Sequence, residues 1–241
     1  MQALPDPPAS DTHIHLCGHW LVALPDGALW WPDAATLIVS DLHLEKGSSY
    51  AARGQMLPPY DTHRTLAGVE RLCRELLPHR VISLGDSFHD RAAETRLDAA
   101  AAERIRALTS SHDWLWVEGN HDPDPPASLG GRAEKRVTLG ALSLCHEPTG
   151  ARGEIAGHLH PAARVRGRGR SVRRRCFASD GERLVMPAFG AFTGGLNVRD
   201  PAVASLFPGG LIAFMLGQDR VFAMTGRQLL SDRQPASSWR L

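Results

Sequence analysis

Residues 34–43 read Ala34-Ala35-Thr36-Leu37-Ile38-Val39-Ser40-Asp41-Leu42-His43, an apolar, β-branched run that ends in two polar side chains around a leucine. A run of this composition, bounded by turn residues, predicts a buried β-strand. Because alternate side chains of a strand share a face, we expect Asp41 and His43 to point to one side and Leu42 into the core. A carboxylate and an imidazole at one strand end make half of a metal site.

The same pattern, a polar cluster directly after an apolar, strand-like run, occurs at four later places. In chain order these clusters are Gly85-Asp86, Gly119-Asn120-His121-Asp122, His146 and Gly157-His158-Leu159-His160. One histidine at a strand end is more often a satisfied polar residue than a ligand, and one aspartate can be a helix N-cap. Five clusters in this order instead predict one shared metal site.

The ordered series D-x-H, G-D, G-N-H-D, H and G-H-x-H resembles the calcineurin-like metallophosphoesterase superfamily over residues 37–160. Three segments are similar, within that superfamily, to the bacterial ligase-associated DNA damage response endonucleases. These segments are Asp41-Leu42-His43-Leu44-Glu45-Lys46-Gly47, Leu57-Pro58-Pro59-Tyr60-Asp61-Thr62 and Gly85-Asp86-Ser87-Phe88-His89. The resemblance implies an α/β fold, a four-layer αββα sandwich in which helices flank two mixed β-sheets.

The resemblance also implies which residues bind metal. One divalent cation would be held by Asp41, His43 and His160, a second by Asn120, His146 and His158, and Asp86 would bridge the two. Imidazole, carboxylate and amide ligands without thiolate suit Mn²⁺, Fe²⁺ or Zn²⁺, and the resemblance favours manganese. Two cations roughly 3.5–4 Å apart suit phosphodiester hydrolysis, because they lower the pKa of a bound water and stabilise the attacking and leaving oxygens.

Other polar residues of these motifs are not ligands in this pattern. The resemblance implies that His121 faces the scissile phosphate and protonates the leaving oxygen or stabilises its charge, with Asp122 orienting the ring. His89 is a candidate contact to phosphate or to a metal-bound water, and otherwise a plain loop histidine. Lys46 is a candidate phosphate contact, or a solvated loop lysine.

An arginine-rich and glycine-rich segment begins shortly after His160. Its arginines are Arg164, Arg166, Arg168, Arg170, Arg173, Arg174 and Arg175. On a flexible segment beside a phosphodiester-cleaving site, they would follow a nucleic-acid backbone. A solvated hairpin loop, or pairing with acids of the same protein, is the alternative interpretation.

The composition, 43% hydrophobic and 22% charged over 241 residues, is typical of a soluble globular protein. Lys+Arg of 27 against Asp+Glu of 26 gives a net charge of +1, so the overall charge predicts no polyanionic partner. The four cysteines form no C-x-x-C pair, which favours free thiols in a reducing cytoplasm. Without a signal-peptide pattern or an apolar run of the ~20 residues that a membrane span needs, we expect a cytoplasmic protein.

We expect one metallophosphoesterase domain over residues 1–228, with an N-terminal β-hairpin within residues 1–33, and a flexible C-terminal tail over residues 229–241. Helical patterns near residues 60–77 and 92–108 alternate with strand-like runs, which predicts a largely parallel first sheet. Short strand-like runs after residue 131 predict a second, mixed sheet.

Taken together, these features predict a metal-dependent endonuclease of DNA repair, acting on single-stranded or gapped DNA. The resemblance implies functional association with a DNA ligase, a helicase and a second nuclease, and no membrane. One alternative is a small-molecule phosphodiesterase or nucleotide pyrophosphatase, which would need a closed pocket. Another is a metal-stabilised binding scaffold, against which the presence of His121 argues.

Overall fold

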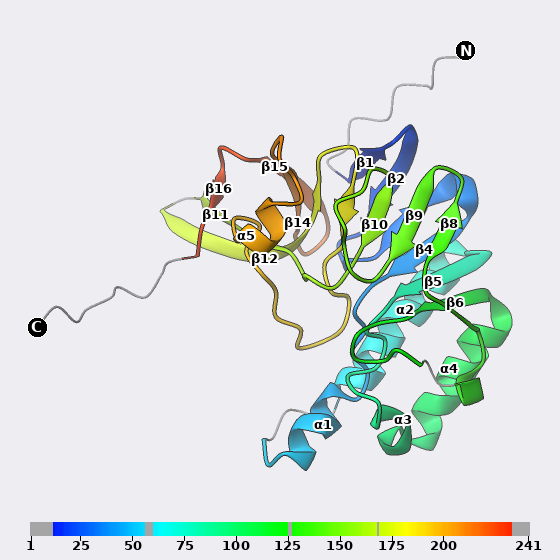
Figure 1. Cartoon of the computed structure of the whole chain (residues 1–241). Helices are drawn as coiled ribbons and strands as arrows, with labels where there is room; N and C mark the ends of the chain where they lie inside the picture. The colour runs from blue at the N-terminus through cyan, green and yellow to red at the C-terminus, as the bar shows by residue number, and fades with distance from the viewer. Residues whose placement is uncertain (1–11, 56–59, 125–126, 168, 233–241) are drawn as a thin grey trace, which may run out of the picture.

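A computed structural model describes residues 12–55, 60–124, 127–167 and 169–232 (Figure 1). Two mixed β-sheets lie face to face in these residues, and helices cover the outer face of the first sheet. This arrangement confirms the predicted sandwich of two mixed sheets.

The first sheet has the strand order β1-β2-β3-β4-β5-β6-β7. Its strands are β1 (His13–Leu16), β2 (His19–Ala23), β3 (Leu29–Trp31), β4 (Thr36–Val39), β5 (Arg80–Leu84), β6 (Asp113–Val117) and β7 (Arg132–Glu134). The N-terminal hairpin is present as β2 and β3, with β1 as an additional antiparallel strand. From β4 to β7 the strands run parallel, so the carboxyl ends of β4, β5 and β6 lie at one edge.

Helices α2 and α4 cover the outer face of this sheet, where they bury Leu66, Val69 and Ile105. The helices are α1 (Lys46–Ala52), α2 (Asp61–Leu76), α3 (Ala93–Arg96), α4 (Ala99–Ser111) and α5 (Pro201–Ala204), with 3-10 turns η1 (Pro32–Ala34) and η2 (Ala127–Leu129). The predicted single helix near residues 92–108 is wrong. The chain breaks at Asp98, whose side chain accepts a hydrogen bond from Ala101 N and caps α4.

The second sheet has the order β15-β14-β12-β13-β10-β9-β8, with β11 paired to β12 and β16 paired to β11. Its strands are β8 (Val137–Leu139), β9 (Leu142–Cys145), β10 (Glu154–Ala156), β11 (Ala162–Gly167), β12 (Arg170–Ser179), β13 (Leu184–Val185), β14 (Ile212–Leu216), β15 (Val221–Thr225) and β16 (Leu229–Leu230). On its outer face, Val203 of α5 and Phe207 pack in one apolar cluster with Cys176 and Ala213. Among the described residues, α5 is the only helix of this fourth layer, which is therefore much thinner than the predicted helical layer.

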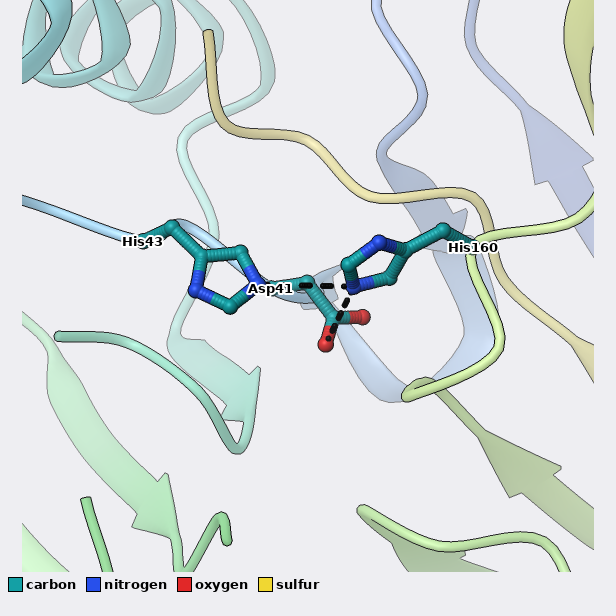
Figure 2. A group of neighbouring side chains, drawn as sticks. All are labelled: Asp41, His43 and His160. Carbon is teal, nitrogen blue, oxygen red and sulfur yellow. Dashed lines mark hydrogen bonds and ion pairs between the residues drawn. The ribbon is translucent and has the colours of Figure 1, made fainter. Parts of the chain in front are cut away.

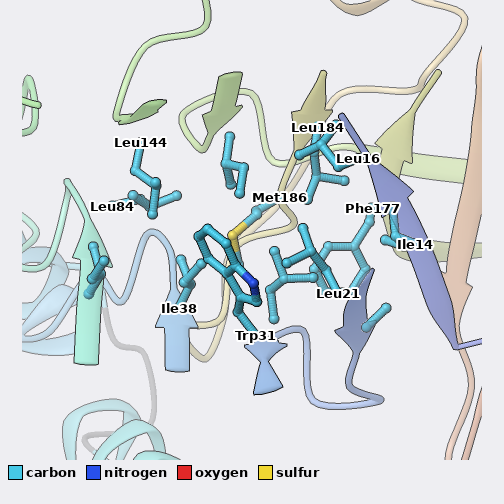
Figure 3. Close-up of a cluster of buried hydrophobic side chains, with 14 of the residues drawn as sticks. Ile14, Leu16, Leu21, Trp31, Ile38, Leu84, Leu144, Phe177, Leu184 and Met186 are labelled. Atoms are coloured by element: carbon cyan, nitrogen blue, oxygen red, sulfur yellow. The ribbon is translucent and has the colours of Figure 1, made fainter. Parts of the chain in front are cut away.

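Between the sheets lies an apolar core, seen in Figure 3, that contains residues from both sheets. The first sheet contributes Trp31, Ile38 and Leu84, and the opposite side contributes Leu144, Phe177, Leu184 and Met186. Burying each such side chain contributes about 1.5–3 kcal/mol. Because β9 and β10 are parallel and packed against the first sheet, their carboxyl ends lie near those of β4 and β5.

Two predictions about the later part of the chain are wrong. The arginine-rich segment is not the expected flexible segment but a regular hairpin, as in the alternative interpretation, since β11 and β12 pair from Ala162↔Arg175 to Gly167↔Arg170. A tail beginning at Leu229 is also excluded, because Leu229 is buried and β16 pairs with β11. Of the predicted features, residues 1–11, 57–59, 168 and 233–241 lie outside the described residues. Within the described chain, no helix combines the length and the apolar character that a membrane crossing requires.

Candidate metal centre

Most of the candidate ligands sit on unusual backbone. The loops after β4, β5 and β10 have positive φ angles at Asp41 (52°), His43 (44°), Asp86 (46°), His158 (68°) and His160 (46°). This left-handed region is unfavourable for residues with a Cβ and is concentrated at functional sites. The expectation that Asp41 and His43 share the face of a strand is wrong, because β4 ends at Val39. The loop conformation, rather than strand alternation, brings these side chains together.

Hydrogen bonds tie the loops to one another. The amide of His43 donates to the carbonyl oxygen of Asp86 (2.9 Å), and the amide of His158 donates to Asp41 Oδ2 (3.1 Å). Gly157 allows this approach, because a Cβ there would collide with Ser40 Oγ. The positions of the polar side chains are therefore set by backbone contacts.

One group consists of Asp41, His43 and His160, whose ligand atoms all lie within 4.8 Å of one another. His160 Nε2 lies 3.1 Å from Asp41 Oδ1 and 3.4 Å from His43 Nε2. Figure 2 shows the two imidazole rings on either side of the Asp41 carboxylate. Asp41 is completely buried, and His43 is buried as well.

A second group consists of Asp86, His146 and His158. His146 Nδ1 lies 2.9 Å from the carbonyl oxygen of Leu84, so this nitrogen donates and Nε2 faces the group. Asn120 lies with this group, since its Oδ1 is 2.8 Å from His146 Nε2 and 3.0 Å from His158 Nδ1.

The carboxylate of Asp86 lies between the two groups. Its Oδ1 is 3.4 Å from His146 Nε2, and its Oδ2 is 3.9 Å from His43 Nε2. One buried carboxylate therefore presents one oxygen to each group.

The donor set fits divalent cations. Asp41 and Asp86 are buried carboxylates, and in the described part of the chain their ion pairs are with histidines and not with lysine or arginine. Buried anions require a compensating positive charge, which two divalent cations would supply. Oxygen and imidazole ligands without thiolate match the class of Mn²⁺, Fe²⁺ and Zn²⁺.

The pKa values of the site residues also favour the binding of cations. Burial lowers the pKa of His43 to about 3, against the charges of Asp41 and Asp86. Burial would raise the pKa of Asp86, but the hydrogen bond to His146 lowers it to about 2. For His146, burial is outweighed by that hydrogen bond and by the charges of Asp41 and Asp86, which raise its pKa to about 9. Cations would therefore bind an ionised Asp86 and displace a proton from His146.

His121 lies on the open side of this centre. Its Nε2 is 3.8 Å from Asp86 Oδ2, while 42% of its side chain is exposed. His89 stacks against it, with ring centroids 5.5 Å apart and planes inclined by 15°, and His89 Nδ1 lies 3.4 Å from His43 Nδ1. Burial lowers the pKa of His89 to about 4, so a neutral ring supports His121.

The structure gives Asp122 a role that differs from the predicted one. Its carboxylate accepts a hydrogen bond from the amide of Phe88 (3.1 Å), and its Oδ1 has no hydrogen-bond partner among the described residues. Burial raises the pKa of Asp122 to about 7. Asp122 thus ties the loop after β6 to the loop after β5 and does not orient the ring of His121.

Part of the predicted arginine surface is used within the protein. Arg164 Nε and Arg173 Nε lie 3.0 Å and 3.2 Å from carboxylate oxygens of Asp232, and Arg175 donates to backbone carbonyls, including that of Ala188. The alternative of pairing with acids of the same protein is therefore met by two of the arginines, Arg164 and Arg173, while Arg175 bonds to backbone instead. Those that remain exposed are Arg166, Arg170 and Arg174.

Sequence reasoning missed the arginines that line a cleft together with His121. A cleft of about 540 Å³ is lined by Asn120, His121, Arg53, Arg91 and Arg96, among others. Single arginines at helix ends form no motif, so no signal in the sequence identifies them. Lys46, the candidate phosphate contact, begins α1, and its ammonium lies 6.0 Å from the ring centroid of Tyr50.

Residues 34–179 match the model of the calcineurin-like phosphoesterase family, and the chain belongs to this family. The resemblance to the metallophosphoesterases seen in the sequence is thus confirmed, and the two ligand groups described above are a candidate metal centre in a chain of this family.

Solved structures that are similar to the chain include a nuclease and a phosphoesterase. The crystal structure of the Pseudomonas putida nuclease MPE has 32% sequence identity and a TM-score of 0.68, and the match covers 88% of this chain and 98% of that chain. Yfce, a phosphoesterase from E. coli, has 16% identity and a TM-score of 0.40 over 77% of this chain and 95% of that chain. A search of curated proteins gave no significant match. Similarity to a nuclease agrees with the narrower resemblance to DNA damage response endonucleases.

Proposed function

We propose that the protein is a metal-dependent phosphodiesterase that hydrolyses DNA and acts as an endonuclease in DNA repair. One observation supports the phosphodiesterase activity: the carboxylate of Asp86 faces both ligand groups, and the partly exposed ring of His121 lies next to it. The DNA part is supported by the similarity to a nuclease over 88% of this chain.

In this proposal, seven side chains hold two divalent cations, with manganese as the expected metal. The ligands of one cation are Asp41, His43 and His160, those of the other are Asn120, His146 and His158, and Asp86 bridges them. When bound, the cations supply a nucleophile from water at neutral pH and neutralise the charge of the phosphate.

His121 acts in this scheme as the general acid. Its backbone amide donates to Asp86 Oδ1 (2.9 Å), which fixes the residue beside the centre while the ring stays accessible to substrate. A proton delivered to the leaving oxygen matters most for a deoxyribose alkoxide, which is a poor leaving group. His89, stacked on His121, would contact the phosphate from the same side.

A comparison of three substrates tests this function. With Mn²⁺ present, the protein should cut covalently closed single-stranded DNA circles and also hydrolyse a bis-aryl phosphodiester. Cutting a circle requires no strand end, so it identifies an endonuclease. Hydrolysis of the bis-aryl compound and of cyclic nucleotides without DNA cleavage would favour the small-molecule phosphodiesterase. DNA binding without any hydrolysis would favour the scaffold.

The repair context is part of the same proposal. The protein would act in the cytoplasm on single-stranded or gapped DNA, together with a DNA ligase, a helicase and a second nuclease, as the sequence resemblance implies. Faster cleavage of a gapped duplex than of an intact duplex would support the substrate preference. Co-purification of a tagged protein with these enzymes would support the association.

A further inference from the structure

The cleft beside His121 is lined by more positive than negative side chains. Its lining comes from α1 and the residue after it, from α3 and the residues before it, and from Asn120 and His121, so it adjoins the candidate metal centre. Its charged residues are three arginines and one aspartate, which gives a net charge of +2. The whole chain has a net charge of only +1, so this surface is locally basic.

Only two of these arginines are available to a ligand. Arg96 Nη2 donates to both carboxylate oxygens of Asp90 (2.9 Å and 2.8 Å), and its Nε donates to Ser48 (3.0 Å). Arg53 and Arg91 are exposed, and within the described ranges neither side chain has an acidic partner. An unpaired guanidinium offers a planar set of donors that matches the oxygens of a phosphate.

The exposed arginines of the β11–β12 hairpin lie elsewhere. Arg166 and Arg170 are at its tip, where the pair Gly167↔Arg170 ends the ladder. In Figure 1 the hairpin extends to the left of the molecule, whereas α1 and α3 lie at the bottom, well separated from it. Arg53 and Arg91 share a cleft with Asn120 and His121, whereas the hairpin arginines do not line it, so the cleft is the better candidate for a contact to a DNA phosphate next to the cleaved bond.

We infer that this cleft binds the phosphate backbone of a nucleic-acid strand next to the scissile bond, with Arg53 and Arg91 each contacting one phosphate. The inference rests on the proposed function, because it requires a substrate that extends beyond one phosphodiester. A small bis-aryl phosphodiester fills the metal centre without reaching both arginines, whereas a DNA strand continues through the cleft.

The test compares three double variants that each remove two positive charges. The cleft variant is Arg53→Gln with Arg91→Gln, the hairpin variant is Arg166→Gln with Arg170→Gln, and the control is Arg106→Gln with Arg227→Gln, both exposed and outside the cleft. Binding of a labelled single-stranded oligonucleotide is measured by fluorescence anisotropy at several salt concentrations. The metal-loaded protein carries His121→Asn in every arm to slow cleavage. Cleavage of DNA and of the bis-aryl phosphodiester is then compared without that background change.

The cleft variant should bind DNA on the order of tenfold more weakly, and its slope of log affinity against log salt should be about 1.4 shallower, since each single-strand phosphate contact contributes about 0.7. Its KM for DNA should rise more than its kcat falls, and the ratio of DNA cleavage to bis-aryl hydrolysis should fall about tenfold relative to the control. The single variants Arg53→Gln and Arg91→Gln should each give about half of the change in slope, which keeps the test valid if the double variant folds poorly.

Three results would overturn the inference. If wild-type protein cuts DNA and the cleft variant matches the control in slope and in KM, only the assignment of the cleft is wrong. The same holds if the hairpin variant alone carries the loss. If metal-loaded wild-type protein hydrolyses the bis-aryl compound but neither binds nor cuts DNA, the proposed DNA function fails, and this inference fails with it.

Discussion

At the scale of single residues, Asp86 contacts both ligand groups and the residue proposed as the general acid. One of its oxygens faces His146 and the other faces His43, while the backbone amide of His121 donates to the first. Its carbonyl oxygen also accepts from the amide of His43. Loss of the carboxylate would therefore disturb both ligand groups and the residue proposed to donate the proton.

Asp86→Ala should abolish hydrolysis of every substrate, because neither cation keeps its shared ligand. Metal content measured by mass spectrometry of the purified protein should fall below that of wild type. The matched control is Asp33→Ala, which removes an exposed carboxylate in η1 and should change neither metal content nor activity. Retention of two metals and of wild-type turnover by Asp86→Ala would show that Asp86 is not the bridging ligand.

His121→Asn should preserve metal content, because the backbone amide that bonds to Asp86 remains. Cleavage should slow on the order of 10²–10⁴-fold for substrates with an alkyl leaving group, which need a proton in the transition state. A bis-aryl phosphodiester, whose aryl oxide leaves unprotonated, should lose much less and serves as the internal control. Losses of equal size on both kinds of substrate would exclude His121 as the general acid.

At the scale of elements, the loop of residues 189–195 supports the ligand loops from the side of the second sheet. The amide of Gly190 donates to the carbonyl oxygen of Asp41 (3.1 Å), and the amide of Phe189 donates to that of Ser40 (2.8 Å). At Gly195 the chain passes so close to His160 that an added Cβ would collide with its carbonyl oxygen, whereas a Cβ on the adjacent Gly194 would meet no atom. These two glycines form a matched pair for mutation.

Gly195→Ala should push the backbone of His160 away from Asp41 and His43. We expect reduced metal content, lower activity on all substrates, and a loss of stability of about 1–3 kcal/mol, as for other overpacked sites. Gly194→Ala should leave metal content and stability close to wild type. Metal analysis and thermal unfolding of the two variants check this, and an equal effect of both would mean that the loop does not support His160.

The grouping of the candidate ligands could be predicted from the sequence because each follows a strand within a short motif, so the local pattern carries the information. Features that depend on contacts between residues far apart in the sequence could not be predicted from it. Arg53 and Arg91 come together only after α1 and α3 fold beside Asn120. Leu229 resembles part of a tail until its pairing with Val165 is known, and Asp122 bonds across to Phe88 in a way that no spacing indicates.

At the scale of the whole molecule, the two sheets act as one frame for a site drawn from distant parts of the chain. His43 and His160 are 117 residues apart in sequence, yet their Nε2 atoms lie 3.4 Å apart. An unfolded chain cannot hold such a site, so metal binding should stabilise the fold.

Mn²⁺ at about one hundred times its dissociation constant should therefore raise the melting temperature by about 5–10 °C, following the linkage between binding and stability. A chelator should reverse the shift. Asp86→Ala, which lacks the shared ligand, should show a much smaller shift in thermal unfolding followed by circular dichroism. If Mn²⁺ raised the melting temperature of Asp86→Ala as much as that of wild type, the stabilising metal would bind at another site.

The central claim, a dinuclear centre that cuts DNA, is tested most directly by titrating metal-stripped protein with Mn²⁺ while following cleavage of circular single-stranded DNA. The account predicts no cleavage by the stripped protein and an activity that rises with added metal and saturates at two equivalents per chain. Full activity in excess chelator, saturation at one equivalent, or no cleavage at any metal concentration would contradict it.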